Sequence, residues 1–220
     1  MKGHQHQSHL LFDVPPSSHN DRPFTVVISG GSSGIGMACA KLCSLHGCSV
    51  HLLGRRESNL QRVIDLCFAS GAHQSSQFHL CDVCDIESIQ KATSTILTQT
   101  HQTIDMVILS AGISMDFNAD EVTPENLAMI FNTNFFGSVW LAQTLMTALR
   151  STHGRLVLVS SASAVLPRPR RSLYSASKAA SETFFFDVQS EEIHSKTGVT
   201  VTVVRPGFVN TEMAMGVSRI

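Results

Sequence analysis

Three side chains in the second half of the sequence have functional groups and spacings that suit proton transfer. Tyr174 and Lys178 are four residues apart, so a helix would place the phenol and the ammonium on one face. Ser161 lies thirteen residues before Tyr174, just after an apolar run that predicts a strand. An ammonium beside a phenol stabilises the phenolate, and a hydroxyl can donate to an oxygen that gains charge. Because Tyr-x-x-x-Lys pairs also occur by chance on exposed helices, the serine is needed to support an acid–base site.

A glycine-rich turn near the start of the sequence is suited to phosphate binding. Residues 29–36 read S-G-G-S-S-G-I-G between a predicted strand and a predicted helix. Glycines permit a tight turn and let backbone N–H groups approach a pyrophosphate, which a helix N-terminus also favours. The strand before the turn and the helix after it supply the context that such a motif requires. The predicted phosphate-binding residues are Gly30, Ser32, Ser33, Gly34, Ile35 and Gly36.

The residues at the end of the second predicted strand indicate which dinucleotide binds. An NAD-binding site usually has a carboxylate about 20 positions after the glycine turn, on the adenosine ribose. Here that stretch contains Arg55 and Arg56 and no carboxylate. A guanidinium attracts the 2′-phosphate that distinguishes NADP from NAD and can bind it with two hydrogen bonds. We therefore predict NADP(H) as the cofactor, with Arg55 as the main phosphate ligand and Arg56 in support.

The elements that must hold these residues alternate regularly along the chain. Short apolar runs predict strands, and longer segments with helical apolar spacing separate them. The predicted strands are 24–29, 49–53, 77–80, 105–110, 155–160 and 199–204, and the predicted helices are 34–46, 58–69, 86–99, 124–150 and 174–196. Strands that are apolar on both faces and alternate with helices form parallel sheets covered on both sides. The predicted fold class is α/β, a Rossmann-type doubly wound parallel sheet in three layers, with the ligand crevice at the carboxyl ends of the strands.

Taken together, these motifs resemble the short-chain dehydrogenase/reductase family, in its classical subgroup. The glycine spacing G-x-x-x-G-x-G, the Ser161–Tyr174–Lys178 spacing and the segment Asn134-Phe-Phe-Gly137 all match family motifs. The resemblance covers about residues 24–213. It implies an oxidoreductase that interconverts a carbonyl and a secondary alcohol by hydride transfer. The relatives it resembles most in general appearance act on steroids, retinoids or keto-lipids.

The resemblance also implies roles for individual residues. Tyr174 would be the general acid in reduction and the general base in oxidation, Lys178 would hold the nicotinamide ribose, and Ser161 would donate to the substrate oxygen. Asn134 would hold a water that links Lys178 to solvent. Ser110 and the residue before it stand where the family usually has two asparagines, so the local hydrogen bonds differ. The further cofactor contacts implied by the resemblance are Asp82, Val83, Ser110, Ala111, Gly112, Pro206, Gly207, Val209 and Thr211.

Composition narrows the range of partners. The formal net charge of the 220 residues is −1 and 15% of them are charged, so we expect no nucleic-acid partner. No apolar run approaches the roughly 20 residues that span a bilayer, and the N-terminus lacks a signal-peptide pattern, so a cytoplasmic protein is expected. Most of the six cysteines fall in apolar segments and predict buried thiols, and Cys81 and Cys84 lack the second ligand pair of a metal site. We expect a disordered tail over 1–22, a single domain over 23–220 and, from the resemblance, a homodimer or homotetramer.

The end of the sequence opens a second interpretation. Family members usually continue with further helices and a last strand, whereas this sequence ends at Ile220. We therefore expect a C-terminally truncated domain that lacks the usual last strand, with strand 199–204 at a sheet edge. Such an edge invites pairing or aggregation unless something covers it. A truncated, non-catalytic NADP(H)-binding or scaffold protein is thus the alternative to an active enzyme with a small-molecule carbonyl or alcohol substrate.

Overall fold

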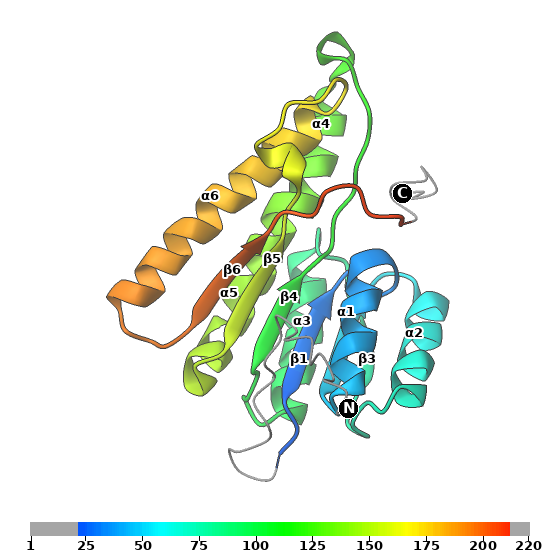
Figure 1. The fold of residues 1–220 in the computed structure, drawn as a ribbon, viewed down its shortest axis with the longest axis vertical. Coiled ribbons are helices and arrows are strands. Elements are labelled where there is room, and N and C mark those ends of the chain that lie inside the picture. Colours follow the sequence, from blue (N-terminus) through cyan, green and yellow to red (C-terminus); the bar gives the residue numbers. More distant parts are fainter. Residues whose placement is uncertain (1–21, 212–220) are drawn as a thin grey trace, which may run out of the picture.

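The computed structural model of the chain describes residues 22–211 and contains one six-stranded parallel sheet (Figure 1). The strands are β1 (Thr25–Ser29), β2 (Ser49–Gly54), β3 (Gln77–Leu80), β4 (Met106–Leu109), β5 (Arg155–Val159) and β6 (Thr200–Val204). Their order across the sheet is β3-β2-β1-β4-β5-β6, and every neighbouring pair is parallel. The predicted doubly wound Rossmann-type sheet is confirmed. The chain changes direction across the sheet between β1 and β4, which is where such sheets open a ligand crevice.

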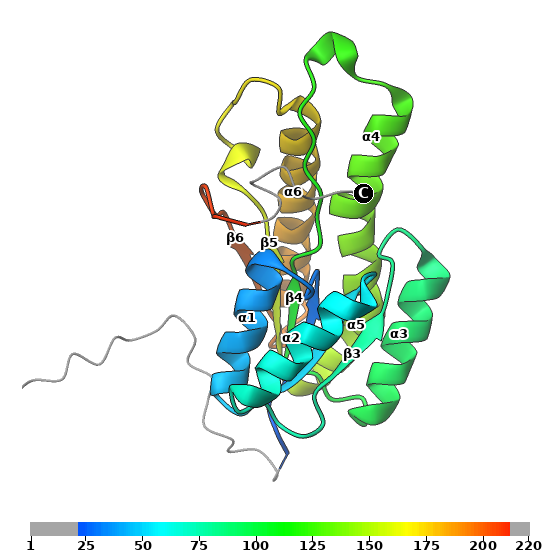
Figure 2. The ribbon, with the colours of Figure 1, turned by 90° about the vertical axis from the view of Figure 1, so that its right-hand side faces the viewer.

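Helices cover both faces of the sheet and make the three predicted layers (Figure 2). The helices are α1 (Gly34–Leu45), α2 (Glu57–Ala69), α3 (Ile86–Gln99), α4 (Pro124–Phe131), α5 (Gly137–Thr152) and α6 (Ser172–His194). One core joins the sheet to α3, α5 and α6 through buried side chains such as Ile96, Leu145 and Phe185. A second core joins the opposite face to α1 and α2 through Ala40 and Leu60. Burial of these apolar faces, more than intrinsic helix propensity, stabilises the helices.

The predicted long helix 124–150 is wrong in detail, because the structure divides it. A π-helical turn over Asn132–Phe136 separates α4 from α5. Such turns are rare, and they concentrate at functional sites. Here the turn contains Asn134, one of the residues predicted to act in the site. A pattern of apolar spacing does not distinguish one wide turn within a helix from a continuous helix, so no sequence pattern predicted it.

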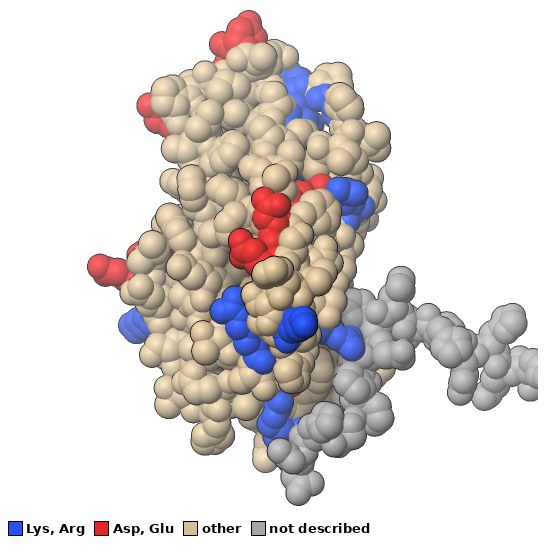
Figure 3. Space-filling model, turned by 90° about the vertical axis from the view of Figure 1, so that its left-hand side faces the viewer, with Lys and Arg blue, Asp and Glu red and all other residues tan. Residues whose placement is uncertain are grey.

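Within the described residues, β6 lies at one edge of the sheet and is only half covered. Val201 is buried against the core that includes α6, whereas Thr200, Thr202 and Val204 on the other face are exposed. The alternation of threonine and valine along this strand accounts for the difference between its two faces. The face over α6 and β6 carries small separate groups of both charge signs on a largely uncharged surface (Figure 3).

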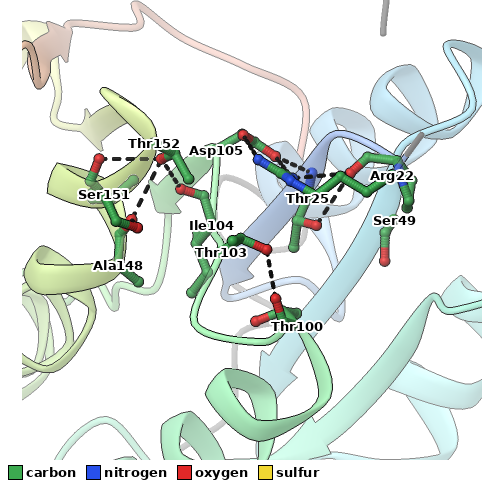
Figure 4. A network of polar contacts seen from close by, with 12 residues as sticks. Arg22, Thr25, Ser49, Thr100, Thr103, Ile104, Asp105, Ala148, Ser151 and Thr152 are labelled. Carbon is green, nitrogen blue, oxygen red and sulfur yellow. Dashed lines mark hydrogen bonds and ion pairs between the residues drawn. The ribbon is translucent and has the colours of Figure 1, made fainter. Parts of the chain in front are cut away.

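Hydrogen bonds join the amino-terminal ends of β1 and β4 at the end of the sheet opposite the predicted crevice (Figure 4). The Asp105 carboxylate accepts two hydrogen bonds from Arg22, at 2.6 and 2.7 Å, and one from the backbone N–H of Thr25 at 2.7 Å. Arg22, which the sequence assigned to the tail, is thus bound to the sheet, while residues 1–21 and 212–220 lie outside the described part. None of the described helices has the length and apolar character needed to cross a bilayer.

Candidate active site

A cleft of about 480 Å³ opens at the carboxyl ends of the strands and brings most of the predicted residues together. The predicted residues that line it are Gly30, Ser32, Ser33, Gly34, Ile35, Arg55, Arg56, Asp82, Val83, Ser110, Ala111, Gly112, Tyr174, Lys178 and Thr211. The glycine turn, the arginine pair and the Tyr174–Lys178 pair therefore share one continuous wall. Segments far apart in the sequence meet here because parallel strands all end at the same edge of the sheet.

Other residues of the cleft were missed, and some predicted ones lie outside its wall. The additional lining residues are Leu53, Gly54, Cys81, Ile113, Thr133, Val159 and Ser160. Most of them adjoin predicted positions at strand ends, so a wider reading of those ends would have found them. Thr133 lies on the π turn, for which the sequence carries no signal. The predicted residues outside the lining are Gly36, Asn134, Ser161, Pro206, Gly207 and Val209.

Close backbone contacts explain two of the glycines in the turn. Gly30 has a φ of +66°, and a Cβ there would lie 2.9 Å from the backbone of Ala111, at the end of the neighbouring strand. Gly36 lies behind the turn, where a Cβ would lie 2.4 Å from the carbonyl oxygen of Gly30. The first turn of α1 therefore packs directly on the loop. This contact holds the N-terminus of α1 against the cleft, where its N–H groups favour an anion.

The two arginines after β2 contact different neighbours in the cleft wall. Arg56 donates hydrogen bonds to the hydroxyls of Ser32 and Ser33 in the glycine turn, at 3.4 and 3.3 Å. Arg55 lies 3.9 Å from the carboxylate of Asp82, and both side chains are about half exposed. An ion pair that is long and exposed is weak and easily exchanged. Both guanidinium groups therefore border the end of β2, which is where the sequence predicted a phosphate ligand.

Lys178 is buried in the cleft wall. Its Nζ donates a 2.9 Å hydrogen bond to the main-chain oxygen of Val159 at the end of β5. Burial, opposed by the negative charge of Glu182, lowers the pKa of Lys178 to about 8. A Cβ on Gly112 would lie 3.5 Å from this Nζ, so the loop after β4 passes close to the ammonium. Lys178 thus occupies a tight position that β5 and the loop after β4 define.

Asn134 is fully buried and joins three elements behind the cleft. Its side-chain oxygen accepts from the N–H of Ile113 at 2.8 Å, and its Nδ2 donates to the Ile113 carbonyl at 3.0 Å. The same Nδ2 donates to the Ser177 hydroxyl at 3.0 Å, while Ser181 donates to the Asn134 carbonyl at 3.2 Å. Both Nδ2 protons are therefore used within the protein. The predicted water relay remains a prediction, and what the structure shows is an anchor between the π turn, the loop after β4 and α6.

Tyr174 lies in the first turn of α6, and its ring is flanked by two cations. The Lys178 Nζ is 6.0 Å from the ring centroid, and the Arg171 guanidinium is 5.7 Å from it. Ser161 begins the short helix η3 (Ala162–Ala164), and its hydroxyl oxygen accepts from the N–H of Ser163 at 3.1 Å. A hydroxyl that accepts one bond can still donate its proton. The neighbouring Ser160 lines the cleft itself, although the prediction preferred Ser161 because its spacing to Tyr174 matches the family better.

Within the described residues, no group of three or more His, Cys, Asp or Glu side chains is arranged to hold a metal ion. The ionisable groups of the cleft wall are thus one phenol, one buried amine, two arginines, the Asp82 carboxylate and the Cys81 thiol, whose pKa burial raises to about 11. This set can bind an anion at the glycine turn and exchange a proton at Tyr174.

Comparison with known proteins identifies the family. A family model described as short chain dehydrogenase matches residues 24–219. Dehydrogenase/reductase SDR family member 7B of Xenopus tropicalis is 33% identical over 196 residues, which are 86% of this chain and 62% of that protein. The 11-beta-hydroxysteroid dehydrogenase 1A of Arabidopsis thaliana is 31% identical over 194 residues, which are 87% of this chain and 54% of that protein. The chain thus spans less than two thirds of the length of these curated relatives.

Solved structures agree on the fold. The alcohol dehydrogenase of the archaeon Thermococcus sibiricus, solved with 5-hydroxy-NADP, superposes with a TM-score of 0.81 at 23% identity and covers 87% of this chain and 79% of that one. A short chain dehydrogenase/reductase of Burkholderia phymatum, solved with NAD, superposes with a TM-score of 0.82 at 22% identity and covers 88% and 68%. With its strand order, its glycine turn and the matched family model, the chain belongs to the short-chain dehydrogenase family.

Proposed function

We propose that the chain is an NADP(H)-dependent oxidoreductase that interconverts a carbonyl and a secondary alcohol. The observation that carries the proposal is that Tyr174 and Lys178 line the same cleft as the glycine turn and the two arginines. The cleft thus offers both an anion site and a phenol next to a buried amine. The curated relatives named as dehydrogenases support the same reaction class.

The residues of the cleft fit a phosphorylated dinucleotide. Gly30 lets the glycine turn pack directly on the loop after β4, since a Cβ there would lie 2.9 Å from the backbone of Ala111. Ser32 and Ser33 supply hydroxyl donors for a diphosphate, while Arg55 and Arg56 border the end of β2, where NAD-binding sites carry an acid. Asp82 is the nearby carboxylate, and Arg55 opposes its charge. These features favour NADP(H) over NAD(H).

The proposed roles follow from position and chemistry. When bound, the nicotinamide supplies or accepts the hydride, which is the cofactor's own chemistry. Tyr174 gives a proton to the substrate oxygen during reduction and takes one during oxidation. Lys178, held by Val159, places a positive charge near the phenol and stabilises its ionised form. Ser161 orients the substrate oxygen by donating its hydroxyl proton.

Exposed apolar side chains next to the site support an apolar substrate. Val165 and Leu166 follow η3, and Phe208 follows Pro206, whose carbonyl accepts from the N–H of Ala162 at 2.9 Å. These three side chains are 55%, 60% and 81% exposed, which is high for residues of this type. Exposed apolar side chains near a cleft mark binding surfaces. We infer a ketone or secondary alcohol on a lipid-like or steroid-like skeleton.

A steady-state screen tests the proposal. Purified protein is mixed with NADPH or NADH and a panel of aldehydes, diketones, steroid ketones and acyl ketones, and cofactor oxidation is followed by absorbance. We expect turnover of at least one apolar ketone with NADPH and much slower turnover with NADH. NADPH binding, measured by fluorescence, without turnover across the panel would contradict an active enzyme and favour an NADP(H)-binding scaffold.

A further inference from the structure

Helix α6 carries a third ionisable side chain in line with the two predicted catalytic ones. Tyr174, Lys178 and Glu182 follow one another at intervals of four residues, so they lie along one face of the helix. Glu182 is 4% exposed and faces the interior. A carboxylate is rarely buried to this extent unless it is paired. Nothing in the proposed reaction uses Glu182, so its burial needs a separate reason.

Arg205 holds this carboxylate from the end of β6. The Arg205 Nε donates to both Glu182 oxygens at 2.9 and 3.0 Å, and a terminal nitrogen donates at 2.7 Å. The guanidinium also lies 5.8 Å from the centroid of the Phe186 ring, one turn further along α6. Paired hydrogen bonds of this kind fix the orientation of a carboxylate as well as its charge. Burial alone would raise the pKa of Glu182, but the bonds from Arg205 and the charges of Arg205 and Lys178 outweigh it and lower that pKa.

The groups that β5 and the loop after β4 place around Lys178 are uncharged. β5 presents the neutral carbonyl of Val159 to it, and the loop after β4 presents the backbone of Gly112. Asn134, on the π turn, is neutral. Among the described residues, the ionisable groups beside Lys178 are thus Tyr174 and Glu182, both on its own helix. Arg205 contacts Glu182 and acts on Lys178 by way of that carboxylate.

Burial works against the role proposed for Lys178. Moving an ammonium out of water favours the neutral amine, and this effect brings the pKa of Lys178 down to about 8. A neutral amine would no longer stabilise an ionised Tyr174. The negative charge of Glu182 acts in the opposite direction and favours the protonated amine. Glu182 lies one helical turn beyond Lys178 and outside the lining of the cleft. A carboxylate within the cleft would repel a phosphorylated dinucleotide.

We propose that Glu182 is an electrostatic positioning residue of the site: a buried carboxylate, held by Arg205, that keeps Lys178 protonated beside Tyr174. The inference rests on the proposed function for its consequence in catalysis, but the ionisation of Lys178 is measurable without turnover. At pH values where Glu182 is ionised with or without Arg205, the positive charge of Arg205 weakens the field of the carboxylate at Lys178, so removal of Arg205 acts in the opposite direction to removal of Glu182. The charge state of the site therefore depends on a contact between α6 and the end of β6.

The opposed signs of the two charges give a sharp test. The protein has five lysines, so ¹³C-labelled lysine gives a small set of side-chain signals whose titration NMR follows, and the Lys178→Met variant assigns the signal of Lys178. Glu182→Gln keeps the size of the side chain, removes its charge and leaves one amide oxygen to accept from Arg205. We expect it to lower the titration midpoint of Lys178 by about one pH unit, and Arg205→Met to raise the midpoint.

A structural role alone predicts a different result. If Glu182 only braces α6 against β6, both substitutions remove the same ion pair and destabilise the protein, with no opposite movement of the midpoint. Midpoints that stay unchanged, or that move in the same direction, overturn the proposal. Glu182→Asp retains the charge, so its Lys178 titration midpoint should lie close to that of the unmodified protein. It serves as the matched control if Glu182→Gln folds poorly.

Kinetics separate this inference from the proposed function. Where turnover is found, the loss of kcat/KM on the alkaline side should begin at lower pH in Glu182→Gln and at higher pH in Arg205→Met. Absence of turnover in the unmodified protein would contradict the proposed function, while opposite shifts of the Lys178 signal would still support the electrostatic role of Glu182. Turnover with a Lys178 midpoint that neither substitution moves would refute the inference and leave the proposed function intact.

Discussion

The guanidinium of Arg171 lies over the ring of Tyr174, 5.7 Å from its centroid. The same guanidinium is 3.0 Å from the carboxylate of Asp116 and donates to the Ser114 hydroxyl, both on the segment that follows β4. The backbone N–H of Phe117 also donates to the Arg170 carbonyl at 3.0 Å. The loop after β4 is therefore bound to the chain immediately before the phenol. Arg171 links the position of that loop to the position of the Tyr174 ring.

Replacing Arg171 with Met should lower kcat/KM by about tenfold, because the ring loses its cation–π partner and the loop loses its ion pair. Steady-state kinetics with NADPH measure the effect. Arg168→Met, in the exposed segment between η3 and α6, is the matched control and should have little effect. Equal activities in the two variants would show that Arg171 does not position the phenol.

Tyr174→Phe removes the hydroxyl and leaves the ring in place. We expect kcat to fall by a factor of about 10² to 10⁴, since proton transfer by a positioned side chain contributes that much. NADPH affinity, measured by fluorescence, should change little because Lys178 and the glycine turn remain. Retention of normal turnover by this variant would exclude Tyr174 as the acid–base group.

The arginine pair predicts cofactor preference. Arg55→Ala and Arg56→Ala should each weaken NADPH binding by roughly tenfold or more, the value of one charge-assisted contact, and leave NADH binding nearly unchanged. Isothermal titration with both cofactors measures this, with Arg62→Ala on exposed α2 as the control. Arg55→Asp should reverse the preference toward NADH. A preference that survives in all three cleft variants would refute an NADP(H) site at the end of β2.

Gly36→Ala should destabilise the protein by about 1–3 kcal/mol, because the new methyl group would lie 2.4 Å from the Gly30 carbonyl and force the backbone apart. Urea unfolding followed by circular dichroism measures the change. Gly207→Ala is the matched stability control, since nothing lies within 4 Å of its Cβ position. If both variants unfold at the same urea concentration as the unmodified protein, the helix does not pack against the turn as described.

Two stacked histidines predict a loss of stability in acid. The Nδ1 of His51 on β2 and the Nε2 of His79 on β3 are 3.2 Å apart. Burial lowers the pKa of both side chains from 6.5 to about 4, and the charge of His79 adds to the effect on the pKa of His51. Between these values the unfolded chain binds protons that the folded protein does not bind. The free energy of unfolding should therefore hold above about pH 6.5 and fall as pH drops toward 4, by up to about 1.4 kcal/mol per pH unit for each histidine.

Urea unfolding at pH 7, 5.5 and 4.5 measures this slope, and His79→Gln should flatten it relative to the unmodified protein. The comparison between the two proteins cancels the contribution of the other ionisable groups. An equal slope in both would mean that the histidine pair is protonated in the folded state.

The sequence predicted what depends on local pattern. The strand Gln77–Leu80 and the helix Ile86–Gln99 have the predicted bounds, because apolar periodicity marks them, and the structure adds an N-cap at Asp85. The glycine turn was found because its chemistry is contained in eight consecutive residues. The same is true of Tyr174 and Lys178, which a helix brings together by spacing alone.

What the sequence could not predict depends on contacts between distant segments. The pairing of Arg171 with Asp116 and that of Arg205 with Glu182 join elements whose approach no local pattern encodes. The choice between Ser160 and Ser161 is similar, since adjacent residues at a strand end point in different directions and only the fold decides which one lines the cleft.

The π turn at Asn132–Phe136 sets the rotational phase of the helix that follows it. Each residue of an α-helix advances the chain by about 100°, and the wide turn absorbs one extra residue, so α5 keeps the phase that a continuous helix one residue shorter would give it. Leu141, Leu145 and Leu149 are fully buried in the present register. A residue inserted or deleted within α5, where no wide turn takes it up, would rotate these leucines by about 100° away from the core. The π turn therefore takes up an extra residue between α4, which packs on α6, and α5, which packs on the sheet.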